Sequence, residues 1–184
     1  MGYLKLIIGP MFAGKSTEII RLSNNYKVIN KVVLPINHII NSRYESDQIV
    51  THNNCVLDGC IIVESLQDVE KNHTDAFKNA DVILIEELQF FKDAFEMIVK
   101  WVDVDGKTVI AAGLDGDAYR MPFGDVLRLI PYADTVNKVS ALCKKCGDGT
   151  PAIFSKKLAN NKTEQIRVGS SNIYEAVCRK HYLE

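Results

Sequence analysis

The chain has 184 residues, of which 47% are hydrophobic and 24% are charged. This length suits one globular domain with a small appendage, large enough to bury most of its apolar side chains. The 22 basic residues nearly balance the 23 acidic ones, so no strong field favours nucleic acid or an anionic membrane. No apolar run approaches the roughly 18 residues of a membrane span. We therefore expect a cytoplasmic protein that partners neither nucleic acid nor membrane.

The most informative segment is a glycine-rich loop near the N-terminus. Its sequence, Gly9-x-x-x-x-Gly14-Lys15-Ser16, has the spacing of a P-loop. Backbone N–H groups of such a loop bind nucleotide phosphates, the lysine adds a positive charge, and the serine hydroxyl suits Mg²⁺. The apolar run Leu4–Ile8 predicts a strand before the loop, and a periodic apolar pattern predicts a helix after it. We interpret this segment as a nucleotide-binding site.

The following elements alternate between strands and helices. Strands are predicted at Lys31–Ile36, Cys60–Val63, Val82–Ile85 and Thr108–Leu114, and helices at Leu66–Phe77 and residues 93–102. Pro35 favours an edge position for its strand, because proline cannot donate a ladder hydrogen bond. The alternation predicts an α/β fold of the P-loop NTPase type, a parallel sheet with helices on both faces. Ligands of such open sheets bind at the carboxyl ends of the strands.

An acidic pair, Glu86-Glu87, directly follows the strand at Val82–Ile85. Phosphoryl-transfer enzymes keep a carboxylate for Mg²⁺ at this place. Two adjacent carboxylates can divide the work, because one can hold the hydrated metal while the other accepts a proton from an attacking hydroxyl. The pair therefore favours a kinase over a simple ATPase.

A second motif lies near the C-terminus, where Cys143-x-x-Cys146 is followed by Cys178-x-x-His181. Two such pairs supply the four ligands of a closed structural Zn²⁺ site. A redox Cys-x-x-Cys is the competing interpretation, but it leaves the second pair unexplained. The odd total of five cysteines disfavours disulfides. Because the composition changes near Ser140, we expect a nucleotide-binding α/β domain at 1–142 and a zinc-binding subdomain at 143–184.

Together these motifs resemble the type II thymidine kinases of animals, bacteria and large DNA viruses. The resemblance extends from Leu4 to Tyr182. It is carried by Gly-Pro-Met-Phe-Ala-Gly-Lys-Ser-Thr at 9–17, Glu-x-Gln-Phe-Phe at 87–91, Leu-Asp-Gly at 114–116, Pro-Phe at 122–123 and the Cys and His pairs. The resemblance implies transfer of the ATP γ-phosphoryl group to the 5′-hydroxyl of thymidine, giving dTMP and ADP for nucleotide salvage and DNA synthesis. It also implies a homotetramer inhibited by dTTP.

The resemblance further implies a role for each matching residue. Glu87 would be the general base, Ser16 and Glu86 would hold Mg²⁺, and the segment from Phe154 to Gly169 would be a lasso loop over thymine, tied down by the zinc. The ATP and Mg²⁺ site would comprise Gly9, Pro10, Met11, Phe12, Ala13, Gly14, Lys15, Ser16, Thr17, Arg43, Glu86 and Gln89. The nucleoside site would comprise Met11, Phe90, Leu114, Ala118, Tyr119, Phe123, Phe154, Ser155, Arg167, Val168, Gly169 and Tyr174.

Two departures from the family pattern leave alternatives open. Glu86 stands where the family usually has Asp, and Ala118 stands where many relatives have an aromatic residue. The alternatives are a deoxynucleoside kinase of altered base selectivity and a non-catalytic nucleotide-binding regulator. Because protein interiors are close-packed, we expect the adjacent Tyr119 to fill the space beside Ala118.

Overall fold

The sheet of this protein is wholly parallel, as the continuous apolar runs predict. The computed structural model describes residues 1–41, 48–50, 56–158 and 173–184. Six strands lie in the order β5-β2-β6-β7-β1-β8, and each neighbouring pair is parallel. Their bounds are β1 Tyr3–Ile8, β2 Val33–His38, β5 Ile61–Val63, β6 Val82–Ile85, β7 Thr108–Gly113 and β8 Thr135–Lys138. β8 was not expected from the sequence, because its short polar segment lacks a continuous apolar run.

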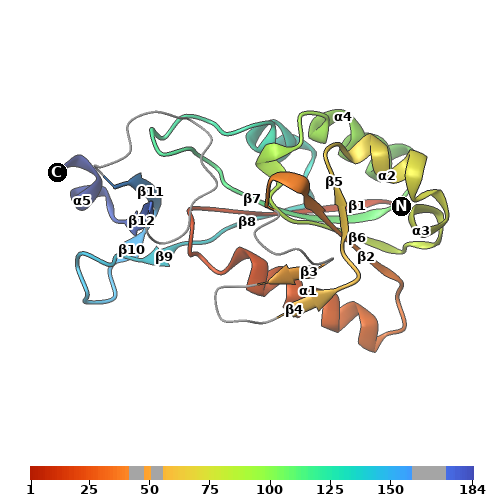
Figure 1. Ribbon diagram of the computed structural model, residues 1–184, viewed down its shortest axis with the longest axis horizontal. Coiled ribbons are helices and arrows are strands. Elements are labelled where there is room, and N and C mark those ends of the chain that lie inside the picture. The colour runs from red at the N-terminus through yellow and green to blue at the C-terminus, as the bar shows by residue number, and fades with distance from the viewer. Residues whose placement is uncertain (42–47, 51–55, 159–172) are drawn as a thin grey trace.

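Helices cover both faces of the sheet (Figure 1). One face carries α1 (Lys15–Val28), with the antiparallel pair β3 (Gln48–Val50) and β4 (Val56–Asp58) beside it. The other carries α2 (Leu66–Asn72), α3 (Thr74–Asn79), α4 (Ala94–Val99), the π-helical turn η3 (Lys100–Val104) and the 3₁₀ helix η4 (Val126–Tyr132). Among the described residues, no helix combines the length and apolar character needed to cross a membrane.

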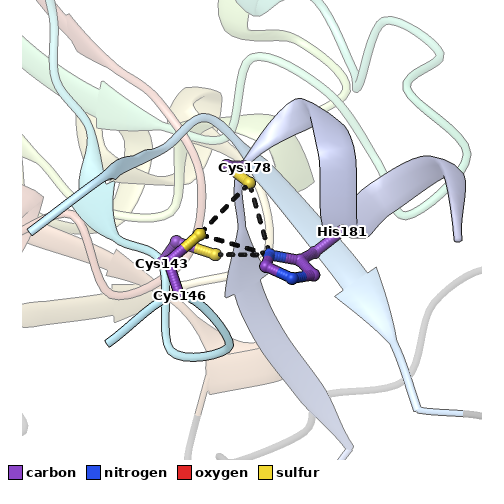
Figure 2. Close-up of side chains that lie close together, drawn as sticks. All are labelled: Cys143, Cys146, Cys178 and His181. Carbon is purple, nitrogen blue, oxygen red and sulfur yellow. Dashed lines mark hydrogen bonds between the residues drawn. The ribbon is translucent and has the colours of Figure 1, made fainter. Parts of the chain in front are cut away.

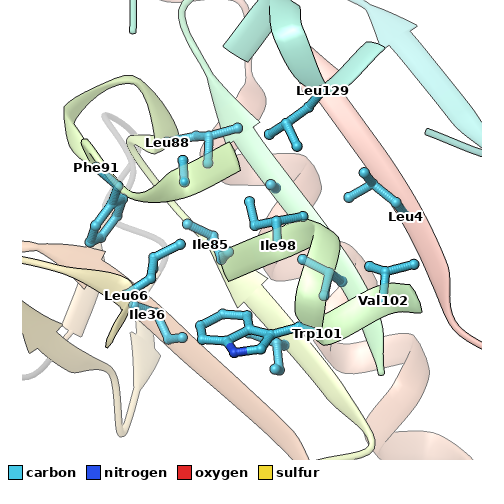
Figure 3. Close-up of a cluster of buried hydrophobic side chains, with 14 of the residues drawn as sticks. Leu4, Ile36, Leu66, Ile85, Leu88, Phe91, Ile98, Trp101, Val102 and Leu129 are labelled. Carbon is cyan, nitrogen blue, oxygen red and sulfur yellow. The ribbon is translucent and has the colours of Figure 1, made fainter. Parts of the chain in front are cut away.

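Alternation along the strands divides the apolar side chains between two cores. In β1, Leu6 belongs to the core beneath α2 to α4, whereas Ile7 belongs to the core beneath α1. Trp101 is fully buried in the first of these cores (Figure 3), and its indole N–H donates to Glu70 at 2.5 Å. Because both faces are covered, the polar groups of the site can gather only at the strand ends.

The structure corrects two local expectations. The helix predicted at Leu66–Phe77 is two helices, α2 and α3, separated at His73. The edge position predicted from Pro35 is wrong, because β2 has β5 on one side and β6 on the other. Pairing with β5 begins only at Ile36, so the proline precedes the stretch that has partners on both sides.

A small C-terminal unit lies beyond the carboxyl ends of the strands (Figure 1). It contains two antiparallel pairs and a short helix: β9 (Ala141–Leu142) with β10 (Pro151–Ala152), β11 (Phe154–Lys157) with β12 (Tyr174–Val177), and α5 (Arg179–Leu183). Its apolar cluster includes Val177 and Ala152 and packs against Phe12 and Ala13 of the glycine-rich loop. The unit therefore contacts the segment predicted to bind phosphate.

Candidate active site

The glycine-rich loop joins β1 to α1, in the strand–loop–helix context predicted from the sequence. Gly9 has φ 152°, and a Cβ atom there would lie 2.3 Å from the Val139 carbonyl oxygen, so only glycine fits this close approach. Gly14 precedes the helix with φ 79°, a left-handed conformation that glycine adopts without strain. The loop thus delivers the helix N-terminus, with its unsatisfied N–H groups, to the carboxyl edge of the sheet.

Lys15 is held over its own loop by main-chain carbonyls. Its ammonium group donates to the oxygens of Pro10 at 2.7 Å and Gly9 at 3.3 Å. Burial lowers the pKa of Lys15, and the nearby carboxylates of Glu87, Glu86 and Asp115 oppose this shift. Lys15 therefore lies near three acidic side chains at this edge, and a bound phosphate or divalent cation would alter the balance of charge.

Glu86 is a buried carboxylate directly joined to the loop. It is 4% exposed, and the Ser16 hydroxyl donates to its Oε1 at 2.5 Å. Burial and the neighbouring Glu87 raise the pKa of Glu86 to about 8, although Ser16 and Lys15 act in the opposite direction. Among the described residues, none makes a hydrogen bond to its buried Oε2. A hydroxyl beside an unsatisfied carboxylate oxygen is a donor set that fits a hard divalent cation such as Mg²⁺.

Glu87 adopts an unusual backbone conformation at the adjacent position. Its φ of 55° places it in the left-handed region, where a residue other than glycine is strained and often functional. The Gln89 side-chain amide donates to Glu87 Oε2 at 2.5 Å and accepts from the Leu114 N–H at 3.0 Å. Gln89, which we assigned to the ATP and Mg²⁺ group, thus connects the carboxylate of Glu87 to the end of β7.

Aromatic rings lie beside this acidic pair. Phe90 and Phe123 meet edge to face with centroids 5.6 Å apart. His38 is the last residue of β2. The centre of its ring lies 5.7 Å from the ring centre of Phe90 and 4.8 Å from that of Phe91. Burial lowers the pKa of His38, which favours the neutral ring. His38 was not among the site residues expected from the sequence; its place at a strand's carboxyl end is the signal that would have indicated this contact.

A second contribution to this edge comes from the C-terminal unit. Ser155 in β11 is buried, and its hydroxyl accepts from the Met11 N–H at 2.9 Å. Tyr174 is buried in β12, opposite Lys157 of β11.

Asp115 forms an ion pair with Lys138 at 2.8 Å, which joins the ends of β7 and β8. Arg43, Arg167, Val168 and Gly169 lie outside the described residues.

Tyr119 does not fill the space beside Ala118. The residue is 60% exposed, so the expectation drawn from close packing is wrong. The reason is local: Asp117 Oδ1 accepts from the backbone N–H groups of Tyr119 and Met121, at 2.8 and 2.9 Å. These bonds close a compact turn that contains the exposed Tyr119.

The Cys and His pairs converge, as the spacing predicts (Figure 2). The ligand atoms of Cys143, Cys146, Cys178 and His181 all lie within 4.8 Å of one another. His181 Nδ1 is 3.3 to 3.4 Å from each sulfur, and the Cys146 and Cys178 sulfurs are 3.7 Å apart. A tetrahedral zinc site with ordinary bond lengths has sulfurs about 3.8 Å apart and sulfur–nitrogen distances of about 3.6 Å. The cluster could therefore hold zinc.

The pKa values of Cys143 and Cys146 are shifted in opposite directions. Burial disfavours the Cys143 thiolate, but hydrogen bonds from the Cys178 and Cys146 backbone and from His181 outweigh it and lower its pKa to about 6. Burial and the adjacent Cys143 raise the pKa of Cys146 to about 11. Zn²⁺ would bind all three cysteines as thiolates and would offset the repulsion between their charges.

The carboxyl edge of this parallel sheet therefore combines a glycine-rich loop, a lysine and paired carboxylates, an arrangement typical of nucleotide-dependent phosphotransferases. The sequence model of the thymidine kinase family matches residues 2–182. Thymidine kinase a of Arabidopsis thaliana is 40% identical over 183 residues, covering 99% of this chain and 75% of that protein. The thymidine kinase of Yaba monkey tumor virus is 40% identical, covering 100% and 96%. The vaccinia virus enzyme is 38% identical, covering 100% and 98%. The chain belongs to the thymidine kinase family.

Proposed function

We propose that this protein is an ATP-dependent thymidine kinase that transfers the γ-phosphoryl group of ATP to the 5′-hydroxyl of thymidine. The observation that carries the proposal is the family match over residues 2–182, together with relatives named thymidine kinase at about 40% identity over the whole chain. The products are dTMP and ADP.

The ATP phosphates are assigned to the loop from Gly9 to Thr17. The N-terminus of α1 faces the carboxyl edge there, and Lys15 would exchange its carbonyl partners for phosphate oxygens. Arg43 is proposed as a further phosphate contact on the family resemblance alone. Ser16 and Glu86 are the proposed Mg²⁺ ligands, supported by their mutual contact and by the unsatisfied Glu86 oxygen. Bound Mg²⁺ would neutralise charge that develops on the transferred phosphoryl group.

Glu87 is the proposed general base. Its carboxylate would accept the proton of the thymidine 5′-hydroxyl as that oxygen forms its bond to the γ-phosphorus. The bond between the γ-phosphorus and the bridging oxygen breaks, and ADP leaves. The bond from Gln89 holds the Glu87 carboxylate in one orientation, so we assign Gln89 a positioning role within the ATP and Mg²⁺ group.

The nucleoside is assigned to the side of the acidic pair that carries the aromatic rings. The contact between Phe90 and Phe123 and the bond between Met11 and Ser155 support this placement. Leu114, Ala118, Phe154, Tyr174 and the residues at 167–169 complete the proposed site on the family resemblance. Tyr119 remains in the proposal only at its backbone, because its ring is exposed.

The remaining assignments follow from the family and from the Cys and His cluster. We propose a structural Zn²⁺ in that cluster, a division into domains at 1–142 and 143–184, a homotetramer, and feedback inhibition by dTTP. A zinc site of three thiolates requires reduced cysteines, which supports a cytoplasmic location.

The test is turnover of thymidine by the zinc-loaded protein with ATP and Mg²⁺, measured as dTMP formed. Deoxyuridine, deoxycytidine and deoxyguanosine are assayed in parallel. Preferential turnover of thymidine is the expected result. Equal or better turnover of another nucleoside would indicate the alternative of altered base selectivity. Binding of ATP without turnover of any of the four would indicate a nucleotide-binding regulator instead.

A further inference from the structure

Residues 114–124, which form most of the loop between β7 and η4, contact the rest of the protein at both ends of this segment and at its tip. At one end the Leu114 N–H donates to Gln89, and at the other Gly124 lies so close that a Cβ there would be 2.4 Å from the Gln89 carbonyl oxygen. Phe123, beside that end, packs on Phe90. Both ends are therefore fixed against the segment that carries the proposed base.

The tip of the 114–124 loop is joined to the C-terminal unit by Tyr182. The Tyr182 hydroxyl donates to the Ala118 carbonyl oxygen at 2.8 Å. The Arg120 guanidinium lies 4.6 Å from the centre of the Tyr182 ring and 5.6 Å from that of Phe154. The Tyr182 and Phe154 rings are 5.0 Å apart. A hydrogen bond and a cation–π contact thus act between the same two segments.

The loop tip is braced by bonds within the loop, and the contact with Tyr182 adds a support from outside it. The two bonds to Asp117 close the turn around Tyr119, and Gly116 forms a bridge with Pro122. Arg120 lies in this turn with a left-handed backbone conformation, φ 66°, and its guanidinium reaches the Tyr182 ring. A residue other than glycine in that conformation is strained, and the contacts of the guanidinium offset the cost.

Tyr182 is in turn held by the Cys and His cluster. It directly follows His181, and its N–H donates to the Cys178 carbonyl oxygen at 3.0 Å. The same unit meets the glycine-rich loop, where the Met11 N–H donates to the Ser155 hydroxyl. The unit therefore connects the loop assigned to ATP with the loop assigned to the nucleoside.

We propose that Tyr182 and Arg120 form a tether that holds the 114–124 loop against the C-terminal unit and thereby sets the affinity for the nucleoside. Both are positioning residues, because they act through Ala118 and the loop wall. The inference rests on the proposed function for the identity of the nucleoside. Loosening the tether should weaken thymidine binding, while ATP, bound at the other loop, is retained.

The experiment compares three variants of the zinc-loaded protein. Tyr182→Phe removes the hydrogen bond and keeps the ring, and Arg120→Gln removes the guanidinium. Arg179→Gln is the matched control. The Arg179 guanidinium also lies over the Phe154 ring, 5.1 Å from its centre, but both residues belong to the C-terminal unit, so this contact does not reach the 114–124 loop. Zinc content is checked for each variant, so that loss of the metal is separated from loss of the tether.

Two readouts are expected to agree. The KM for thymidine should rise about 3- to 10-fold in Tyr182→Phe and in Arg120→Gln, the range for one partly exposed polar contact, while the KM for ATP stays within about 2-fold. Amide hydrogen exchange in a peptide covering 114–124 should become faster in both variants, without substrates present. Arg179→Gln should match the wild type in both readouts.

Three results would overturn the inference. An unchanged thymidine KM in Tyr182→Phe excludes the effect on affinity, and unchanged exchange at 114–124 excludes the tether itself. Equal rises in both KM values with full zinc content indicate a general structural role. If the wild type does not phosphorylate thymidine, the proposed function and the affinity claim fail together, and the exchange experiment still decides whether the tether exists.

Discussion

Glu86 should link the stability of this protein to pH. Its pKa is raised from 4.5 to about 8 by burial and by Glu87, so the folded state binds its proton more tightly than the unfolded chain does. The resulting stabilisation is fully present below pH 4.5 and is lost progressively as the pH rises through about 8. Glu86→Gln keeps the shape of the side chain but has no proton to lose. Its stability should therefore lack this component of the pH dependence.

The size of the effect follows from the two pKa values. A carboxyl group with a pKa of 4.5 in the unfolded chain and about 8 in the fold loses about 3 kcal/mol of its stabilisation between pH 5.5 and pH 8.5. For a chain of this length, 1 kcal/mol corresponds to about 2 to 4 °C in Tm. The Tm of Glu86→Gln relative to wild type should therefore increase by about 6 to 12 °C over that pH range.

The assay is thermal unfolding of zinc-loaded protein at pH 5.5, 7.0 and 8.5, without Mg²⁺ or nucleotide. Glu96→Gln, at an exposed position of α4, controls for the loss of one acidic side chain. Addition of Mg²⁺ and ATP should stabilise the wild type most at pH 8.5, because the ionised Glu86 gains a cation. A Tm difference between wild type and Glu86→Gln that stays constant from pH 5.5 to 8.5 would refute the reasoning.

Three further predictions concern catalysis, the metal and specificity. Glu87→Gln keeps the shape of the side chain and a hydrogen bond but removes the base, so kcat should fall on the order of 10²- to 10⁴-fold with ATP binding nearly intact. If Glu87→Gln kept most of its activity and Glu86→Gln lost activity, the roles of the two residues would be reversed. One Zn²⁺ per chain should be found by elemental analysis of freshly purified, reduced protein, and Cys178→Ala should raise the thymidine KM more than the ATP KM; protein without zinc would contradict the site. Ala118→Phe should tighten thymidine binding and exclude analogues with bulky 3′ or 5-position groups. Tyr119→Ala should leave the thymidine KM unchanged. A sharp rise in the thymidine KM of Tyr119→Ala would show that Tyr119 closes over the nucleoside.

Much of the fold could be predicted from the sequence, because its information is local. Continuous apolar runs such as Val82–Ile85 specify buried parallel strands, and β6 has these same bounds. The spacing of Cys143, Cys146, Cys178 and His181 predicted a cluster that the structure brings within ligand distance. The loop from Gly9 to Ser16 has the predicted strand before it and the predicted helix after it. In each case residues close together in the sequence carry the pattern, which for the metal cluster means each of its two pairs.

Features that depend on contacts between distant segments were decided only by the tertiary structure. Pro35 can lie in an interior strand because β5, on that side, pairs with β2 only from Ile36 onward, which the proline's own chemistry does not reveal. Tyr119 faces solvent because Asp117 closes its turn, and Gln89 turns out to join Glu87 to the end of β7. The sequence by itself determined which chemical groups this protein has and which strand ends carry them. Their orientation and partners were set by packing between elements far apart in the chain, because a side chain's direction in a loop depends on what the fold places beside it.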